Sequence, residues 1–162
     1  MESLSKSLSE YVKLLQETNL QKAYKGLIEY ISELRKHFKE NFSEYEVSGS
    51  LYQGYLDLTF FTLTTKEMKL KELKFAIVFI HDKMQFEVWL SGKNRAVMSS
   101  YHKKFSNYQL DNYTLAEDEK GMDSIIEAVL VDKPNFDNLI ELTNEIEIGV
   151  INFIKDIENL IN

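Results

Sequence analysis

Residues 75–80 read FAIVFI, and this run without a polar position constrains the fold more than any other stretch of the chain. β-branched and aromatic residues favour strands, and a strand that is apolar on both sides is normally covered on both sides. We expect its odd-numbered residues to contact one layer of the protein and its even-numbered residues to contact another. Lys74–His81 is therefore predicted to be a central strand of a sheet.

Two further strands are predicted on either side of this run. Gln53–Leu63 alternates in a way that is typical of a strand with two different faces. Gln85–Leu90 also alternates, with Glu87 and Trp89 opposite its three apolar residues. Residues 82–83 fit a two-residue turn. Three consecutive strands joined by short links favour an antiparallel meander.

The beginning of the chain has the 3.6-residue period of two amphipathic helices. The first carries apolar residues from Leu4 to Leu15 on one face, and Ser3 is placed to cap it. The second follows a break at residues 17–19 and is predicted to run to about Glu40. We expect the two helices to form a hairpin whose apolar stripes need a partner.

The chain after the third strand gives mixed signals. Asn94 can cap a helix that ends near Phe105, and residues 108–115 alternate weakly, as a short strand would. Residues 116–121 are predicted to form an acidic surface loop. Ser124–Val131 fits both a capping-box helix and an apolar strand, so both assignments stay open.

A long final helix is predicted to begin at Pro134, because proline is favoured in the first helical turn. We expect it to pack its apolar stripe on the N-terminal hairpin or on the sheet, with acidic residues on its exposed side. The stripe consists of Phe136, Leu139, Ile140, Ile146, Val150, Phe153, Ile154, Ile157 and Leu160.

These elements define an α+β fold class. The expected architecture is an N-terminal helical hairpin, an antiparallel three- to five-stranded sheet, flanking helices and a long C-terminal helix. A single domain is expected over residues 1–162. A chain of this mass should fold to a surface of roughly 8,400 Å² and bury about 70% of its unfolded surface, which suffices for one core.

Charge is unevenly distributed along the chain. The net charge is −7, but residues 108–162 carry −10 and residues 1–107 carry +3. An acidic surface repels phosphate backbones, so no nucleic-acid partner is expected. The sequence has no cysteine, which excludes disulfides and thiolate metal sites. Its N-terminal residues lack the pattern of a secretory signal and its apolar runs are short, so we expect a cytoplasmic protein without a membrane partner.

Four stretches together resemble a family of uncharacterised bacterial proteins. They are KAYKGLIEYISELRKHF at 22–38, GSLYQGYLDLTFF at 49–61, KFAIVFIHDKMQFEVWLSGKNR at 74–95 and GMDSIIEAVLVDKPNF at 121–136. The resemblance spans essentially the whole chain. It implies a bacterial, cytoplasmic, single-domain protein, and it supplies no activity, cofactor or catalytic residue.

The predicted order α-β-β-β-α-β also resembles, more weakly, the core of the PD-(D/E)xK nucleases. That resemblance implies an acidic residue on one strand and Glu-x-Lys on the next, which together hold Mg²⁺ and stabilise charge. The matching positions are Asp57 and the triplet Glu87-Val88-Trp89. Trp89 stands where the lysine is required, and it cannot supply a cation.

A candidate surface cluster follows from these positions. It comprises Asp57, Glu87, Trp89, Lys93 and Arg95. If the polar faces of the two strands coincide, the two carboxylates share a surface with an aromatic ring and two cations. The arrangement fits either a binding site or a plain carboxylate–cation pair under a covering helix.

The histidines and the glycines suggest no catalytic or cofactor site. His37, His81 and His102 lack a paired metal-ligand spacing, and His81 is interpreted as a hydrogen-bonded structural residue. Phosphate-loop, dinucleotide and triad-hydrolase motifs are absent from the sequence. We therefore expect no metal and no cofactor.

The function favoured by these observations is a non-catalytic binding domain for a small molecule or a protein. The alternative is a degenerate nuclease-like enzyme that uses Asp57 and Glu87. The long apolar final helix is also compatible with a homodimer.

Overall fold

The run at residues 75–80 lies in the centre of a sheet. In the computed structural model, which describes residues 3–117 and 123–162, strand β4 (Leu73–Ile80) pairs with β3 (Leu58–Thr65) and with β5 (Gln85–Gly92). Every residue of β4 from Phe75 to Phe79 is buried, on both faces of the strand. The predicted central strand is confirmed.

The described part of the chain forms one antiparallel sheet of seven strands, in the order β1-β3-β4-β5-β7-β6, with β2 paired to β3. The α+β class is confirmed, and the sheet has more strands than expected. The other elements are α1 (Leu4–Glu17), α2 (Leu20–Asn41), β1 (Tyr45–Val47), β2 (Tyr52–Gln53), α3 (Lys66–Leu70), α4 (Arg95–Phe105), β6 (Thr114–Leu115), β7 (Ile126–Asp132) and α5 (Leu139–Ile161).

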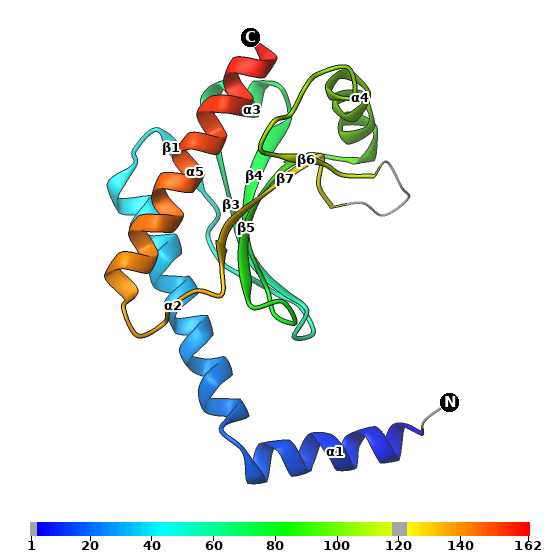
Figure 1. Ribbon diagram of the computed structural model, residues 1–162, viewed down its shortest axis with the longest axis vertical. Coiled ribbons are helices and arrows are strands. Elements are labelled where there is room, and N and C mark those ends of the chain that lie inside the picture. Colours follow the sequence, from blue (N-terminus) through cyan, green and yellow to red (C-terminus); the bar gives the residue numbers. More distant parts are fainter. Residues whose placement is uncertain (1–2, 118–122) are drawn as a thin grey trace.

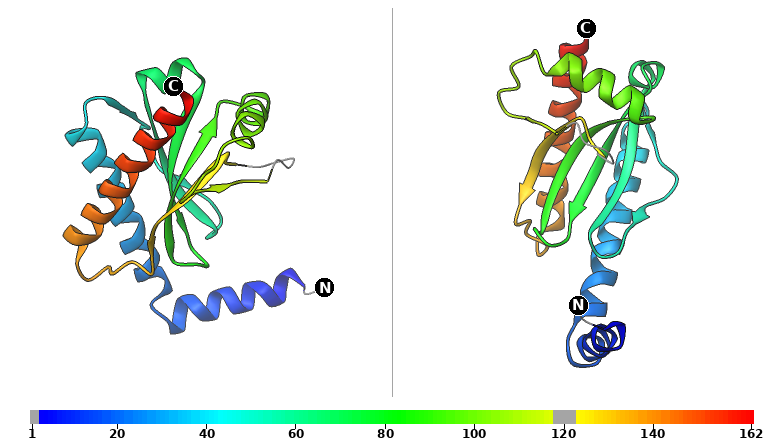
Figure 2. Two further views of the ribbon diagram at one scale, coloured as in Figure 1. Left: turned by 45° about the horizontal axis from the view of Figure 1, so that its top comes forward. Right: turned by 90° about the vertical axis from the view of Figure 1, so that its right-hand side faces the viewer.

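Helices α2 and α5 lie side by side on one face of the sheet (Figures 1 and 2). They bury their apolar stripes against the odd-numbered residues of β3 and β4 and the even-numbered residues of β5, which form the main core. The buried helix residues are Tyr30, Ile31, Leu34 and Phe38 from α2, and Leu142, Ile146, Val150, Phe153, Ile154 and Ile157 from α5.

The opposite face of the sheet is largely open. Helix α4 covers only one end of it, and the right-hand view of Figure 2 looks onto the strands with no other described helix in front of them. Val78 on this face is nevertheless 0% exposed. Its register neighbours are Phe60 on β3 and Glu87 on β5, and side chains on adjacent strands shield one another. The even-numbered side of β4 is thus covered by neighbouring side chains rather than by a layer of helices.

The N-terminal pair of helices is present, and the predicted cap is confirmed, since the Ser3 side chain accepts a hydrogen bond from the backbone N–H of Lys6. The two helices do not lie along one another. Figure 1 shows α1 leaving the start of α2 at a steep angle and crossing below the sheet. No residue of α1 is buried, so its apolar stripe has no partner within the described chain.

The strand predicted for Gln53–Leu63 is interrupted. The chain turns between β2 and β3, where Leu56 has a φ of 63°. The Gly54 N–H donates to the Leu58 carbonyl at 3.0 Å, and a Cβ on Gly54 would collide with the Asp57 carboxylate. The alternating pattern of this segment therefore hides a tight turn that depends on glycine.

The last helix starts later than predicted. Pro134 is buried in the connection after β7, and α5 begins at Leu139 with the Asn138 side chain as its cap. Leu139 and Ile140 are exposed, so they do not belong to the buried stripe, whereas Leu142 does. Phe136 precedes the helix and packs its ring against Tyr30, Phe79 and Phe86.

The structure decides the open assignment at Ser124–Val131. Residues 126–132 form strand β7, which pairs with β5 through a register shift beside Phe86. The weak pattern at residues 108–115 yields only the two-residue strand β6, and the link at residues 66–71 contains the short helix α3. The acidic loop predicted at residues 116–121 lies mostly outside the described residues. Of the helices described, none is both long enough and apolar enough to cross a membrane.

Candidate functional site

The structure brings Glu87 and Trp89 together on the open face of the sheet. The Trp89 Nε1–H donates to one carboxylate oxygen of Glu87 at 2.9 Å, and the Gln85 amide donates to the other at 2.6 Å. Positions 85, 87 and 89 alternate along β5, so their side chains share one face. Glu87 is buried, and its carboxylate is held by neutral donors of its own strand.

Asp57 lies apart from this group. Its carboxylate accepts the Tyr55 N–H at 2.8 Å, and backbone hydrogen bonds, chiefly that of Leu58, lower the pKa of this exposed carboxyl. The Asp57 backbone carbonyl accepts the His81 N–H, so Asp57 lies opposite His81. Glu87 lies opposite Val78, three residues from His81 along β4. Asp57 and Glu87 are therefore three residues apart along the strands and two strands apart across the sheet. Strand spacings make that separation about 14 Å.

The two cations of the predicted cluster lie beyond the other end of β5. The Lys93 ammonium lies 3.6 Å from a carboxylate oxygen of Glu72. The backbone N–H of Lys93 also donates to the backbone carbonyl of Glu72. Arg95 is the first residue of α4 and is exposed. The Asn94 side chain caps this helix by accepting the Val97 N–H at 3.0 Å, as predicted. Among the predicted cluster residues, Glu87 and Trp89 are joined by a hydrogen bond between their side chains.

A second carboxylate that sequence reasoning missed lies beside Glu87. Glu127 on β7 is directly opposite Trp89 in the register, so it belongs to the open face. Burial, and secondly the charge of Glu87, raises the pKa of Glu127 above the usual value for glutamate. The alternation of β7 could have revealed it, but the sequence of this segment also fits a helix.

We expect Glu127→Gln to stabilise the protein at neutral pH. The pKa of Glu127 is higher in the folded state than in the unfolded state. The contribution of Glu127 to the free energy of unfolding is therefore fully favourable below the unfolded-state pKa, and it is lost as the pH rises through the folded-state pKa. The neutral amide removes this loss and keeps an acceptor for Ser124. The thermal midpoint of the variant should exceed that of the parent at pH 7, and the difference should vanish below about pH 4.

The exposed Glu145→Gln on α5 is the control for this comparison. It removes the same charge elsewhere. The change in thermal midpoint between pH 7 and pH 4 should therefore be the same in this variant as in the parent. Equal effects of the two substitutions would mean that net charge, rather than the environment of Glu127, sets the pH dependence.

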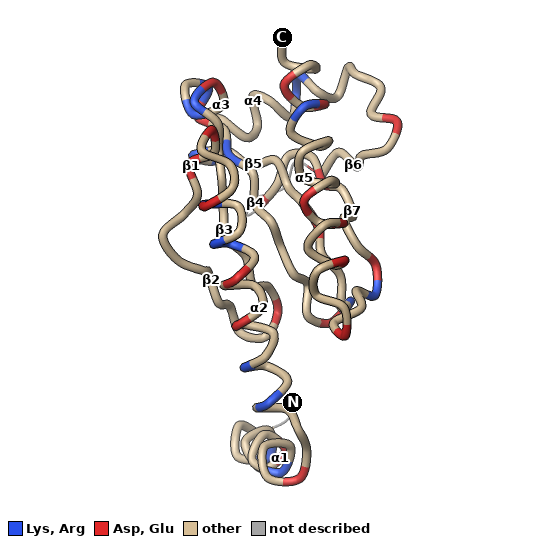
Figure 3. Tube along the Cα trace, turned by 90° about the vertical axis from the view of Figure 1, so that its left-hand side faces the viewer, with Lys and Arg blue, Asp and Glu red and all other residues tan. Residues whose placement is uncertain are grey.

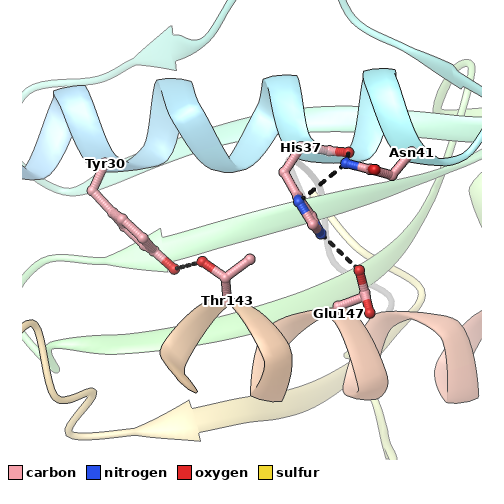
Figure 4. Close-up of polar contacts among 5 residues, drawn as sticks. All are labelled: Tyr30, His37, Asn41, Thr143 and Glu147. Carbon is pink, nitrogen blue, oxygen red and sulfur yellow. Dashed lines mark hydrogen bonds and ion pairs between the residues drawn. The ribbon is translucent and has the colours of Figure 1, made fainter. Parts of the chain in front are cut away.

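A groove between α2 and α5 contains a second polar cluster, shown in Figure 4. His37 Nε2 lies 2.6 Å from a carboxylate oxygen of Glu147, and the Asn41 amide lies 3.3 Å from His37 Nδ1. One turn or more along the groove, the Tyr30 hydroxyl and the Thr143 hydroxyl share a hydrogen bond of 3.0 Å. Two side-chain contacts, His37–Glu147 and Tyr30–Thr143, therefore connect α2 to α5.

The groove is open enough to hold a small molecule. One part has a volume of about 510 Å³ and an adjoining part about 300 Å³, and the two share Tyr30, Glu33, His37 and Thr143. The walls of the larger part are apolar at Tyr30, Leu139 and Ile140. The remaining lining residues of this part are Gly26, Glu29, Asn144 and the shared Glu33, His37 and Thr143.

Sequence reasoning did not find this groove. His37 and Glu147 are 110 residues apart, and no local spacing links them. The only signals were a histidine among the polar positions of one helix and an acidic face on another. By contrast, the interpretation of His81 is confirmed, because its Nε2 lies 2.8 Å from the Thr59 hydroxyl, and burial lowers its pKa.

These observations define the chain as an α+β domain whose helices α2 and α5 cover one face of an antiparallel sheet. In the described ranges, no group of three acidic, histidine or cysteine side chains is arranged to hold a metal ion. The chain belongs to a family described as Domain of unknown function (DUF7000), whose model matches residues 4–161. Neither a curated protein nor a solved structure matches it.

Proposed function

We propose that this chain is a non-catalytic binding domain of the bacterial cytoplasm, and that the groove between α2 and α5 binds a small organic cation with an apolar body. The groove volume of about 510 Å³ carries this proposal. Ligand sites of this kind span roughly 300–1,000 Å³ and combine apolar walls with a few polar groups. Tyr30, Leu139 and Ile140 supply the walls here.

The charges that line the groove favour a cation. Glu29, Glu33 and Glu40 line its two parts, against the single cation Lys36. Lys36 bonds Glu33 at 3.3 Å in an exposed pair, and exposed pairs are weak enough to open for a ligand. Figure 3, which faces α2 and α5, shows further acidic positions along both helices.

The hydrogen bonds of His37 support binding rather than catalysis. A general base needs a free ring nitrogen directed at the substrate. Glu147 and Asn41 lie within hydrogen-bond distance of the two ring nitrogens of His37. The Thr143 hydroxyl, which also lines the groove, shares its hydrogen bond with Tyr30 rather than with His37.

The enzyme alternative based on Asp57 and Glu87 is not favoured by the geometry. A metal-dependent nuclease holds its ion between converging carboxylates. Asp57 is bonded to its own turn and Glu87 to Gln85 and Trp89, so the two do not converge.

The test is a comparison of phenethylammonium with phenylacetate, which share an aromatic body and differ in charge. We expect phenethylammonium to shift the amide resonances of Tyr30, Thr143 and Asn144 at millimolar concentration, because both the apolar walls and the carboxylates contribute. Glu29→Gln/Glu33→Gln should weaken its binding about fivefold to tenfold, which corresponds to about 1–1.4 kcal/mol.

Glu127→Gln is the control for position, since it removes one carboxylate from the opposite face of the sheet. It should leave the affinity for phenethylammonium unchanged. Equal binding of the ammonium and the carboxylate probes, or resonance shifts confined to other surfaces, would contradict the proposal.

A further inference from the structure

Helix α1 has an apolar stripe that no other described part of the chain covers. Six of its side chains are exposed: Leu4, Leu8, Tyr11, Val12, Leu14 and Leu15. Its charged residues, Lys6, Glu10, Lys13 and Glu17, recur at the same spacing on the opposite side. An isolated helix of 14 residues is marginal in water, and most helical stability in proteins comes from packing an apolar face.

The folded chain also exposes more surface than a monomer of its size should. Its accessible surface is 10311 Å², whereas a 19.0 kDa monomer is expected to expose about 8,400 Å². The surplus of about 1,900 Å² matches what one subunit conceals in a large homodimer interface, about 1,000–2,500 Å².

The open face of the sheet is the second uncovered surface. It includes Val129, which is 57% exposed on β7, and the half-buried Phe60, Ile80 and Trp89. At its lower end the loop and turn beside the strands expose Tyr52, Tyr55, Leu56 and Met84. Figure 1 shows α1 projecting below these turns, on the side toward which the open face is directed.

We propose that the partner of α1 is a second copy of this chain, and that each α1 packs on the open sheet face of the other copy. A two-fold arrangement covers both uncovered surfaces of each chain at once, because every contact occurs twice. Helix α1 carries two lysines and two glutamates, so its net charge is zero. It can therefore approach a copy of net charge −7 without the repulsion that the acidic body of the chain would meet.

The first test measures the mass of the full chain by light scattering at micromolar concentration. The parent should have twice the mass of one chain. Leu8→Asp/Val12→Asp places two charges in the stripe and should give a monomer with a cooperative melt, since neither residue is buried in the monomer. Ser9→Asp/Gln16→Asp adds the same charge outside the stripe and should stay dimeric. A monomeric parent, or a Leu8→Asp/Val12→Asp variant that remains dimeric, overturns the proposal.

The second test identifies the surface that α1 contacts. Because the chain has no cysteine, a nitroxide can be attached to Ser9→Cys alone. Chains of natural isotope abundance carry the nitroxide, and they are mixed with ¹⁵N-labelled chains that have no nitroxide. Any broadening of the ¹⁵N-labelled resonances therefore arises between copies. We expect broadening at Val129, Glu87 and Val78, and none at Thr143 on the far side of the sheet.

Two other results would overturn the assignment. Broadening between copies that is confined to α1 would mean that the helices pair with each other and leave the sheet open. Broadening of β7 only when the nitroxide and the ¹⁵N label are in the same chain would mean that α1 folds back on its own sheet.

Discussion

Val78→Asp should prevent the protein from folding. Val78 is 0% exposed in the middle of β4, between Phe60 and Glu87 in the register. An aspartate there would lie directly opposite the carboxylate of Glu87 in the register. Burying an unpaired polar group costs roughly 2–7 kcal/mol and burying an unpaired charge costs more, against about 5–15 kcal/mol of total stability. The variant should be insoluble, or should show no cooperative transition in circular dichroism.

Lys74→Asp is the control for this substitution. Lys74 is on the same strand and the same face as Val78, four residues away, and it is exposed. The variant should express and melt cooperatively. A soluble Val78→Asp protein with a transition close to that of Lys74→Asp would mean that this side of β4 is accessible to water.

Deletion of residues 135–162 should abolish soluble expression. This segment contains α5, which buries six apolar side chains to 2% exposure or less. Each is worth about 1.5–3 kcal/mol, so together they equal or exceed the whole stability of a typical domain. Soluble yield and a melt monitored by circular dichroism are the measurements.

The other terminal helix provides the contrast. Deletion of residues 1–18 removes α1, which buries no residue, and the rest of the chain should retain a cooperative melt. A truncated chain without α5 that melts cooperatively as a monomer would show that the sheet and α2 suffice for the core. A chain without α1 that fails to fold would show that α1 contributes to the core after all.

The fold could be predicted from the sequence wherever the signal is local. Strands β4 and β5 follow from runs of apolar and alternating residues, and the caps Ser3 and Asn94 follow from residues next to the helices they begin. These signals act over a few residues, so neighbouring sequence is enough to define them.

Other parts of the fold depend on contacts that local sequence does not specify. The turn before β3 is set by the close approach of Gly54 to the Asp57 carboxylate, inside a segment that alternates like a strand. Pro134 has the properties of a helix start, yet it is buried in the connection before α5. An amphipathic pattern predicted α1 as a helix, but nothing in that pattern says which surface it contacts.

The candidate sites were less predictable than the fold for the same reason. Glu87 and Trp89 are two residues apart on one strand, so alternation alone places them together. Glu127 joins them through the pairing of β5 with β7, and His37 meets Glu147 through the packing of α2 on α5. Such pairs form only when distant segments fold together.

The two edges of the sheet differ in how far they are protected against the addition of another strand. Its outermost strands, β1 and β6, have three and two residues, and β2, which also pairs with β3, has two. A long bare edge would offer a row of free N–H and C=O groups on which any extended peptide could add as another strand. On the β3 side, β1 and β2 leave only a few such groups, so edge-to-edge pairing is disfavoured there. On the other side β6 pairs with only Ile126 and Glu127, so residues 128–132 of β7 form the longer edge of the described sheet.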